Sequence, residues 1–346
     1  MSRLFGYELK KILSGAALWS FVVLCILFNI WAMPTHMNRF EFDTTTPFPS
    51  NVFENYDTGR TAEAYISFFE LEGRVAQRMR AKYDALQTVV DQNAVAGYSY
   101  SPYFGWYTYL MHNNLFHSFG VVGRLVLQGI LLAALLALLS VGYEQTNSTE
   151  PSVYATKTGR HILWYKIGAS LTATVVLYAL LVAVTLGVYF SIFDYSNVWG
   201  SSVSSGFNYI GSVMGTRPFV TWQSFTVATY LLASLGVSVV LAVCFALMGA
   251  IVGTLVKNTY VGFLAVVAVN AACMVMPILI PMNLYAHYIS FYTPILLWLN
   301  SARWFTCGGF TALWRNFELW GAGISLAVLA ILCIIAVKKF EKRNIV

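Results

Sequence analysis

Long apolar segments alternate with shorter polar ones along the chain, and six of them are long enough to cross a membrane. Crossing about 30 Å of hydrocarbon takes roughly 20 helical residues. The pattern predicts membrane-spanning helices over residues 15–33, 116–143, 167–190, 225–256, 261–280 and 319–337. The connecting segments are residues 34–115, 144–166, 191–224, 257–260 and 281–318, and residues 338–346 form a tail. The predicted fold class is an all-α polytopic membrane protein.

Residues 1–14 have a helical pattern of their own. Their apolar and basic positions lie on different faces: Leu4, Phe5, Leu9 and Ile12 on one, and Arg3, Lys10 and Lys11 on another. Such a pattern predicts an amphipathic helix that lies along the membrane interface before the first span. A plain extension of the first span is the alternative.

The longest connection, residues 34–115, is predicted to be an external insert. Its first part is rich in Thr, Pro, Asn and Asp, which is typical of irregular structure. Apolar residues then recur at helical intervals and predict one long amphipathic helix over residues 61–92, with Tyr65, Phe68, Val75, Met79, Leu86 and Val90 on its apolar face. The Tyr- and Trp-rich stretch 98–109 is either an interfacial aromatic belt or a surface that stacks on substrate.

The connection 281–318 is unusually apolar for a segment in water. Its apolar pieces, 292–298 and 304–310, are too short to span. Helices that are re-entrant or lie on the outer surface fit this pattern, provided that the protein buries their backbone.

The composition agrees with a membrane protein. Of the 346 residues, 58% are hydrophobic and only 10% are charged, whereas soluble domains carry about 25% charged residues. The net charge of +6 lies beside the apolar segments, which favours contact with anionic lipid headgroups rather than with nucleic acid. The five cysteines include no C-x-x-C pair, so neither a metal site nor a disulfide framework is expected.

Basic residues near the span ends predict the orientation. The two short connections on one side hold only Arg217, Arg303 and Arg315, and the other side holds Arg3, Lys10, Lys11, Lys157, Arg160, Lys166, Lys257, Lys338, Lys339, Lys342 and Arg343. Since basic residues favour the cytoplasmic side, we expect a multi-pass protein of the cell's inner (plasma) membrane with both termini cytoplasmic. The first apolar run is too long for a cleavable signal peptide, and no A-x-A site follows it.

No pattern in the chain indicates catalysis. The phosphate-binding sequence G-x-x-x-x-G-K-[ST] is absent, as are G-x-S-x-G and H-E-x-x-H, and the five histidines are scattered. We therefore expect a non-catalytic chain that holds no cofactor.

The connection 144–166 carries the most specific pattern. Glu144 closes an apolar segment, a short helix-forming stretch follows, and the basic and aromatic sequence GRHILWYK of residues 159–166 opens the next span. With the amphipathic start FGYELKK at residues 5–11, the insert after the first span and the external helices before the last, this order resembles the permeases of the ABC-2 type exporter family. The resemblance covers most of the chain except the insert.

The resemblance implies partners and a coupling element. It implies a cytoplasmic pair of ABC ATPase subunits, which would hold ATP and Mg²⁺, and a second permease subunit, identical or different. A coupling helix is expected around residues 148–157, where Ser148 or Thr149 caps its start and Glu150 favours its positive end. Val153 and Tyr154 would enter a groove in the ATPase.

Two features of this connection bear on the coupling hypothesis. Glu144 and Arg160 are close enough in a hairpin to pair, and we expect them to orient it. The family often has Gly-Thr after the acidic residue, where this chain reads Gln145-Thr146-Asn147. An ordinary solvated loop is the alternative to a coupling helix.

Polar residues within the apolar segments are candidates for a substrate path. Arg124, expected about two turns into the second span, could recognise an anionic group with Gln128 on the same face, or instead extend toward the outer headgroups. Asn270 is a further candidate, although a hydrogen bond between helices is the simpler interpretation. Gly249 and Gly253 predict a close helix contact.

The leading hypothesis is an ABC exporter permease that moves an amphipathic or hydrophobic substrate: a peptide, including an antimicrobial peptide, a lipid or a drug. An ATPase-independent carrier or channel is the alternative, although no Asp or Glu is expected deep in a span. A membrane sensor that binds ligand with its external insert is the third.

Overall fold

The computed structural model describes residues 2–33, 51, 53–96, 114–156, 158–196, 199–204, 210–212, 215–256 and 258–342. The first part of the insert and the aromatic stretch 98–109 lie outside these ranges, as do Lys157, Lys257 and Arg343. Within the described ranges the chain is mostly helical, with irregular connections between the helices. The strands found in these ranges are β1 (Ile210–Ser212) and β2 (Gly215–Arg217), which form a short antiparallel hairpin.

Five helices are long and apolar enough to cross a membrane: α6 (Val121–Thr146), α8 (Ile162–Ile192), α9 (Val227–Leu255), α10 (Thr259–Leu279) and α13 (Phe317–Glu341). A bent pair, α1 (Ser2–Leu13) and α2 (Ala16–Trp31), would make a sixth span. The prediction of a polytopic helical membrane protein is thus confirmed at this level. The bend between α1 and α2 is 58°, so residues 1–14 do not simply extend the first span.

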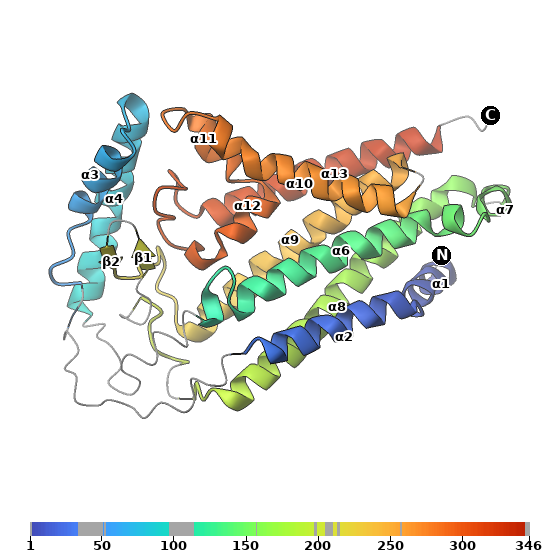
Figure 1. Ribbon diagram of the computed structural model, residues 1–346, viewed down its shortest axis with the longest axis horizontal. Helices are drawn as coiled ribbons and strands as arrows, with labels where there is room; N and C mark the ends of the chain where they lie inside the picture. The colour runs from blue at the N-terminus through green and yellow to red at the C-terminus, as the bar shows by residue number, and fades with distance from the viewer. Residues whose placement is uncertain are drawn as a thin grey trace.

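The long helices run roughly side by side (Figure 1). Both described chain ends and the short helix α7 (Glu150–Tyr154) lie at one end of this bundle. At the other end lie α3 (Thr58–Phe68), α4 (Gly73–Val95) and the β-hairpin. The predicted termini and 144–166 connection therefore share one end, opposite the part of the insert that the structure describes.

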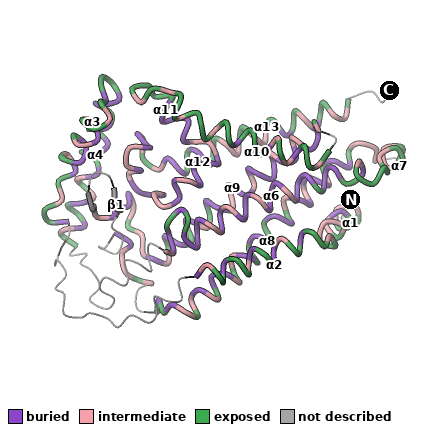
Figure 2. The backbone as a smooth tube through the Cα atoms, in the orientation of Figure 1, coloured by how far each residue is buried: buried purple, intermediate pink, exposed green. Residues whose placement is uncertain are grey.

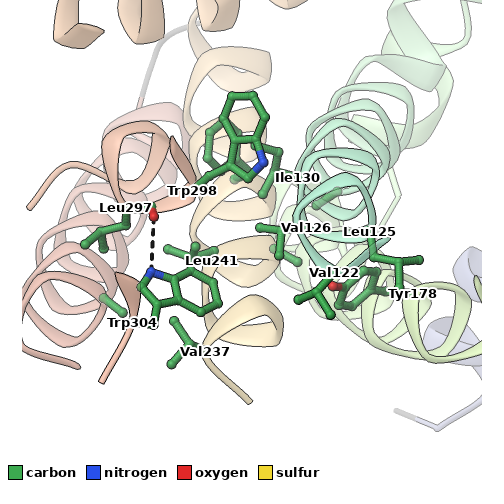
Figure 3. Packing of buried hydrophobic residues seen from close by; sticks show 14 of the residues in the cluster. Val122, Leu125, Val126, Ile130, Tyr178, Val237, Leu241, Leu297, Trp298 and Trp304 are labelled. Carbon is green, nitrogen blue, oxygen red and sulfur yellow. Dashed lines mark hydrogen bonds between the residues drawn. The ribbon is translucent and has the colours of Figure 1, made fainter. Parts of the chain in front are cut away.

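Helix α6 is the centre of the bundle. Of its most apolar stretch 78% is buried, against 22% in α10 and in α13, whose outer faces are exposed along much of their length (Figure 2). The core around α6 includes Val126, Leu241 and Trp304, with Trp304 Nε1 donating to Leu297 O at 3.1 Å (Figure 3).

Small residues let α9 approach α6 closely. A Cβ added at Gly249 would lie 2.8 Å from Ala134 O, and one added at Gly253 would lie 3.1 Å from Val141 Cβ. The close helix contact predicted from these two glycines is confirmed.

The prediction of one amphipathic helix over residues 61–92 is wrong, because two helices, α3 and α4, form there. Glu70 (φ 49°) and Gly73 (φ 56°) both take a left-handed conformation that ends α3 and starts α4 in a new direction. The apolar periodicity is otherwise correct. Five of the six predicted positions are buried, and only Phe68 is exposed.

The α3–α4 hairpin packs on the loop that precedes α13. The shared apolar cluster includes Met79, Leu86, Trp222, Tyr288 and Leu313. This cluster explains why the apolar face of the hairpin is buried at the end of the bundle.

A buried ammonium group joins the hairpin to the same loop. Lys82 Nζ donates to Cys307 O (3.2 Å), Gly309 O (2.5 Å) and Ala312 O (2.8 Å). Gly308 (φ 66°) and Gly309 (φ 58°) take the left-handed conformation that turns these carbonyls toward the ammonium. Burial lowers the pKa of Lys82 to about 8.

The connection 281–318 contains the short helices α11 (Tyr285–Ser290) and α12 (Pro294–Leu299) and the 3-10 turn η3 (Ser301–Arg303). Of the two apolar pieces named from the sequence, 292–298 overlaps α12 and 304–310 is not helical. Most of α12 is buried against the bundle, and Trp298 Nε1 donates to Gly123 O of α6 at 2.8 Å. The protein therefore buries this irregular backbone, as an intramembrane or surface-lying hairpin requires.

Candidate functional site

The end of the bundle that holds α7 gathers most of the residues singled out from the sequence. There the C-terminal end of α6 leads into α7, and the 3-10 turn η2 (Gly159–His161) leads into α8. Helix α1 and the C-terminal end of α13 lie beside them (Figure 1). We call this assembly the α7 end.

The helix expected around residues 148–157 forms over a shorter range, Glu150–Tyr154. Pro151 lies in its first turn, and Glu150 lies at its positive end. Neither Ser148 nor Thr149 provides the expected side-chain cap, so that prediction is wrong. Ser148 (φ 56°) makes a left-handed turn instead, and Thr149 is not in the extended conformation that a capping side chain needs.

Helix α7 packs on the last helix of the chain. The ring of Tyr154 meets that of Phe340 edge-on, with centroids 5.9 Å apart. Arg160 Nη1 donates to Phe340 O at 3.1 Å, and its guanidinium lies over both rings. Burial raises the pKa of Tyr154, whose hydroxyl donates to Glu150 at 3.4 Å. Tyr154 thus contacts α13, and both Val153 and Tyr154 are half-exposed.

A second contact with α13 lies one turn further along the chain. Trp164 Nε1 donates to Glu341 Oε1 at 3.0 Å, and His161 Nδ1 lies 2.9 Å from the same oxygen. The segment from α7 to the start of α8 is therefore held against the end of α13 at several points.

Glu144 belongs to a buried cluster of four charged side chains. It pairs with Lys11 (Nζ–Oε1 2.6 Å) and, by a short contact, with Lys166. Glu8 completes the cluster, at 3.6 Å from Lys11 and 4.0 Å from Lys166. Lys166 also donates to Ser140 O at 2.8 Å. We call these four side chains the charge cluster.

The predicted pair of Glu144 with Arg160 is wrong. The α6 face that carries Glu144 turns toward α1 and α8, where the two lysines reach it, and Arg160 reaches α13 instead. Two acids and two bases balance formally, which suits a site that water hardly reaches.

The sequence analysis did not identify Glu8 as part of this site. A signal was present, because Glu8 lies four residues after Leu4 and four before Ile12, on the apolar face of α1. A charge in that position implies a buried partner. Lys11 and Lys166 were noted as basic residues beside the spans, and neither was expected to pair with Glu144.

The candidate substrate-path residues lie away from the α7 end and do not form one site. Gln128 exchanges two hydrogen bonds with Asn29 of α2, at 2.8 and 2.9 Å. Asn29 also donates to Thr185 of α8 at 3.1 Å. These bonds join three helices and occupy the Gln128 amide that was expected to act with Arg124.

Arg124 lies in the first turn of α6, which begins at Val121. The candidate span begins earlier, at Asn114, so the expected position about two turns into the second span stays a prediction. Arg124 Nη1 donates to Ala32 O at 3.4 Å. Its Nε is buried without a hydrogen-bond partner among the described residues.

Asn270 makes the hydrogen bond between helices that its position suggested. Its Nδ2 donates to Val266 O (2.8 Å) on its own helix and lies 3.2 Å from Met248 Sδ on α9. The contact accounts for the burial of this amide.

At the α7 end, α7 contacts α13 through Tyr154 and Phe340, and the charge cluster joins the end of α6 to α1 and α8. Comparison of the chain with protein-family models, with curated proteins and with solved structures found no match.

Proposed function

We propose that this chain is the permease subunit of an ATP-driven exporter of the ABC-2 type. It works with a second permease subunit and a pair of ATPase subunits in the cytoplasm. The single observation that supports this best is the α7 end. There a short, partly exposed helix makes an aromatic contact with the end of α13, and the charge cluster beside it joins the end of α6 to α1 and α8.

In this proposal both termini and α7 are cytoplasmic, and the α3–α4 hairpin is external. The excess of basic residues at the α7 end supports the orientation. All six spans of the predicted layout are used, with α1 along the inner interface and α2 as the first span. ATP and Mg²⁺ belong to the partner, which matches the lack of a nucleotide-binding motif in the sequence.

The coupling step follows from the contacts. ATP binding draws the ATPase subunits together and displaces α7. Phe340 transmits this displacement to α13, and Glu144 transmits it to the helices that carry Lys11 and Lys166. Glu144 is held by Lys11 and Lys166 at once, so that the three helices that carry these residues move together, as coupling requires.

The exported substrate is amphipathic or hydrophobic: a peptide, a lipid or a drug. The half-exposed Arg124, with a buried Nε that lacks a partner among the described atoms, supports recognition of an anionic group near the outer end. Gln128 supports the helix packing there and does not act as a second ligand.

The test is co-purification of a nucleotide-binding partner with the chain expressed in its own host. Wild type should retain the partner and show transport-linked ATP hydrolysis. Glu150→Lys should lose both, because it reverses the charge at the positive end of α7. Tyr154→Ala should retain binding but uncouple hydrolysis from transport, because it removes the contact with Phe340.

Glu63→Lys is the matched control, since Glu63 is an exposed acid on α3 at the opposite end of the bundle. It should behave as wild type. Transport by the purified chain without any ATPase, or unchanged transport in both α7 variants, would refute the proposal and favour a secondary carrier.

A further inference from the structure

The C-terminal ends of α9 and α13 enclose a groove at the α7 end. The groove has a volume of about 760 Å³ and is lined by Thr254, Leu255, Lys338, Lys339, Phe340 and Lys342. It lies outside the charge cluster, and of its lining residues only Phe340 also takes part in the coupling step proposed above.

The groove is positively charged without local compensation. Lys338, Lys339 and Lys342 are all exposed, and none has an acidic partner among the described residues. The neighbouring Glu341 is engaged by Trp164 and His161. Glu144 is engaged by lysines of other helices.

The face of α13 that leads to the groove is apolar. Ile331 and Ile335 are exposed, by 57% and 55%, and lie four residues apart. Lys338 and Lys342 follow at intervals of three and four residues, so that all four share one helical stripe. Leu255 of α9, 64% exposed, extends the apolar surface on the other wall.

This stripe fits a ligand with an anionic head and an apolar tail. A soluble anion would make no apolar contact with the exposed isoleucines, and a lipid without net charge would not neutralise the ammonium groups. We infer that the groove between α9 and α13 binds the phosphate headgroup of an anionic phospholipid, whose acyl chains lie along Ile331 and Ile335.

The site rests on charge and shape at the end of the bundle and requires no ATPase. Two ammonium groups near an anionic headgroup favour binding by several-fold each. Removal of both should therefore weaken binding roughly tenfold or more. Anionic phospholipids with one negative charge or with several can make the same contacts between phosphate and ammonium groups.

The experiment measures retention of phosphatidylglycerol and of phosphatidylcholine by the purified full chain, using native mass spectrometry after titration of each lipid into detergent. Wild type should prefer phosphatidylglycerol. The double variant Lys338→Gln and Lys342→Gln should lose this preference. The double variant Arg3→Gln and Lys10→Gln removes the same charge from exposed positions of α1 and should keep it.

If both double variants lost the preference for phosphatidylglycerol equally, the preference would come from the general surface charge, and the inference of a specific site would be refuted. Displacement of the lipid by millimolar inorganic phosphate would show an anion site without lipid specificity, which also refutes the inference. So would lysine variants that keep the lipid and lose a nucleotide-binding partner, since the groove would then be a protein-docking surface. Because the lipid assay uses the isolated chain, its failure leaves the exporter proposal standing.

Discussion

Lys82 makes the attachment of the α3–α4 hairpin dependent on pH, with a sign that the structure predicts. The ammonium is buried among three carbonyl oxygens, beside the ring of Tyr83 at 4.7 Å. Its pKa falls from the ordinary 10.5 to about 8, chiefly because burial removes water from the charge. The nearby Cys307 raises this pKa and Arg303 lowers it, both by smaller amounts.

The sign follows from proton binding. When the hairpin detaches, Lys82 returns to water and regains a pKa near 10.5. Below pH 8 the lysine is protonated in both states, so the attachment does not depend on pH. Between pH 8 and 10.5 the detached state binds more protons, and attachment therefore strengthens as the pH rises. From pH 7 to pH 9 the gain is about 1.4 kcal/mol, equivalent to about tenfold in the opening constant.

Amide hydrogen exchange of α4 measures this opening directly. After correction for the base-catalysed chemical rate, protection factors in the apolar half of α4 should be about tenfold higher at pH 9 than at pH 7. Lys82→Met and Lys82→Arg should abolish the rise, since neither side chain loses a proton in this range. Either variant suffices if the other does not fold.

Arg80→Gln is the matched control on the same helix. Arg80 is exposed and pairs with the exposed Glu63, so its removal should keep the rise. Protection that is flat or falling with pH in wild type would contradict the reasoning. An equal rise in the Lys82 variants would assign the effect to another group.

Two further predictions concern the bundle. Glu144→Gln leaves the buried Lys166 and the half-buried Lys11 without their main partner and should lower the free energy of unfolding by about 3–5 kcal/mol. Glu150→Gln on the half-exposed α7 should cost less than about 1 kcal/mol, and similar losses for both variants in denaturant unfolding would contradict the charge cluster's role. Gly249→Ala places a methyl group 2.8 Å from Ala134 O and should cost about 1–3 kcal/mol, while Gly236→Ala meets nothing within 4 Å and should leave the unfolding midpoint unchanged or raised. Equal midpoints for the two glycine variants would show that α6 and α9 tolerate separation.

The sequence predicted the helices far better than their partners. Apolar runs of spanning length are a local property, and five long helices and the bent pair follow from them. The prediction of one helix over residues 61–92 was wrong because of the backbone conformation at two positions, which apolar periodicity does not report. Periodicity continues through Glu70, and only the left-handed backbone at Glu70 and Gly73 interrupts it.

The candidate site was predicted only as far as neighbouring residues determine it. A short helix that begins near Pro151 follows from local preferences, and it is present. Only one partner of Glu144, Lys166, lies in the 144–166 connection; the other, Lys11, lies 133 residues away and could not be predicted from that connection. Arg160 was expected to pair with Glu144 in the hairpin, but it donates to Phe340 O at the C-terminal end of α13 instead.

The basic residues at the α7 end show why counting charges by position has a limit. Lys166 and Lys338 both lie at the end of an apolar run and contribute equally to the predicted orientation. In the structure Lys166 is buried and paired with an acid, while Lys338 is exposed in a groove that holds no acid among its lining residues. The first stabilises the contact between helices, and only the second is available to an anionic ligand. Burial therefore separates two roles that the same residue type and the same sequence position cannot distinguish, and it is the exposed lysines that carry the lipid inference.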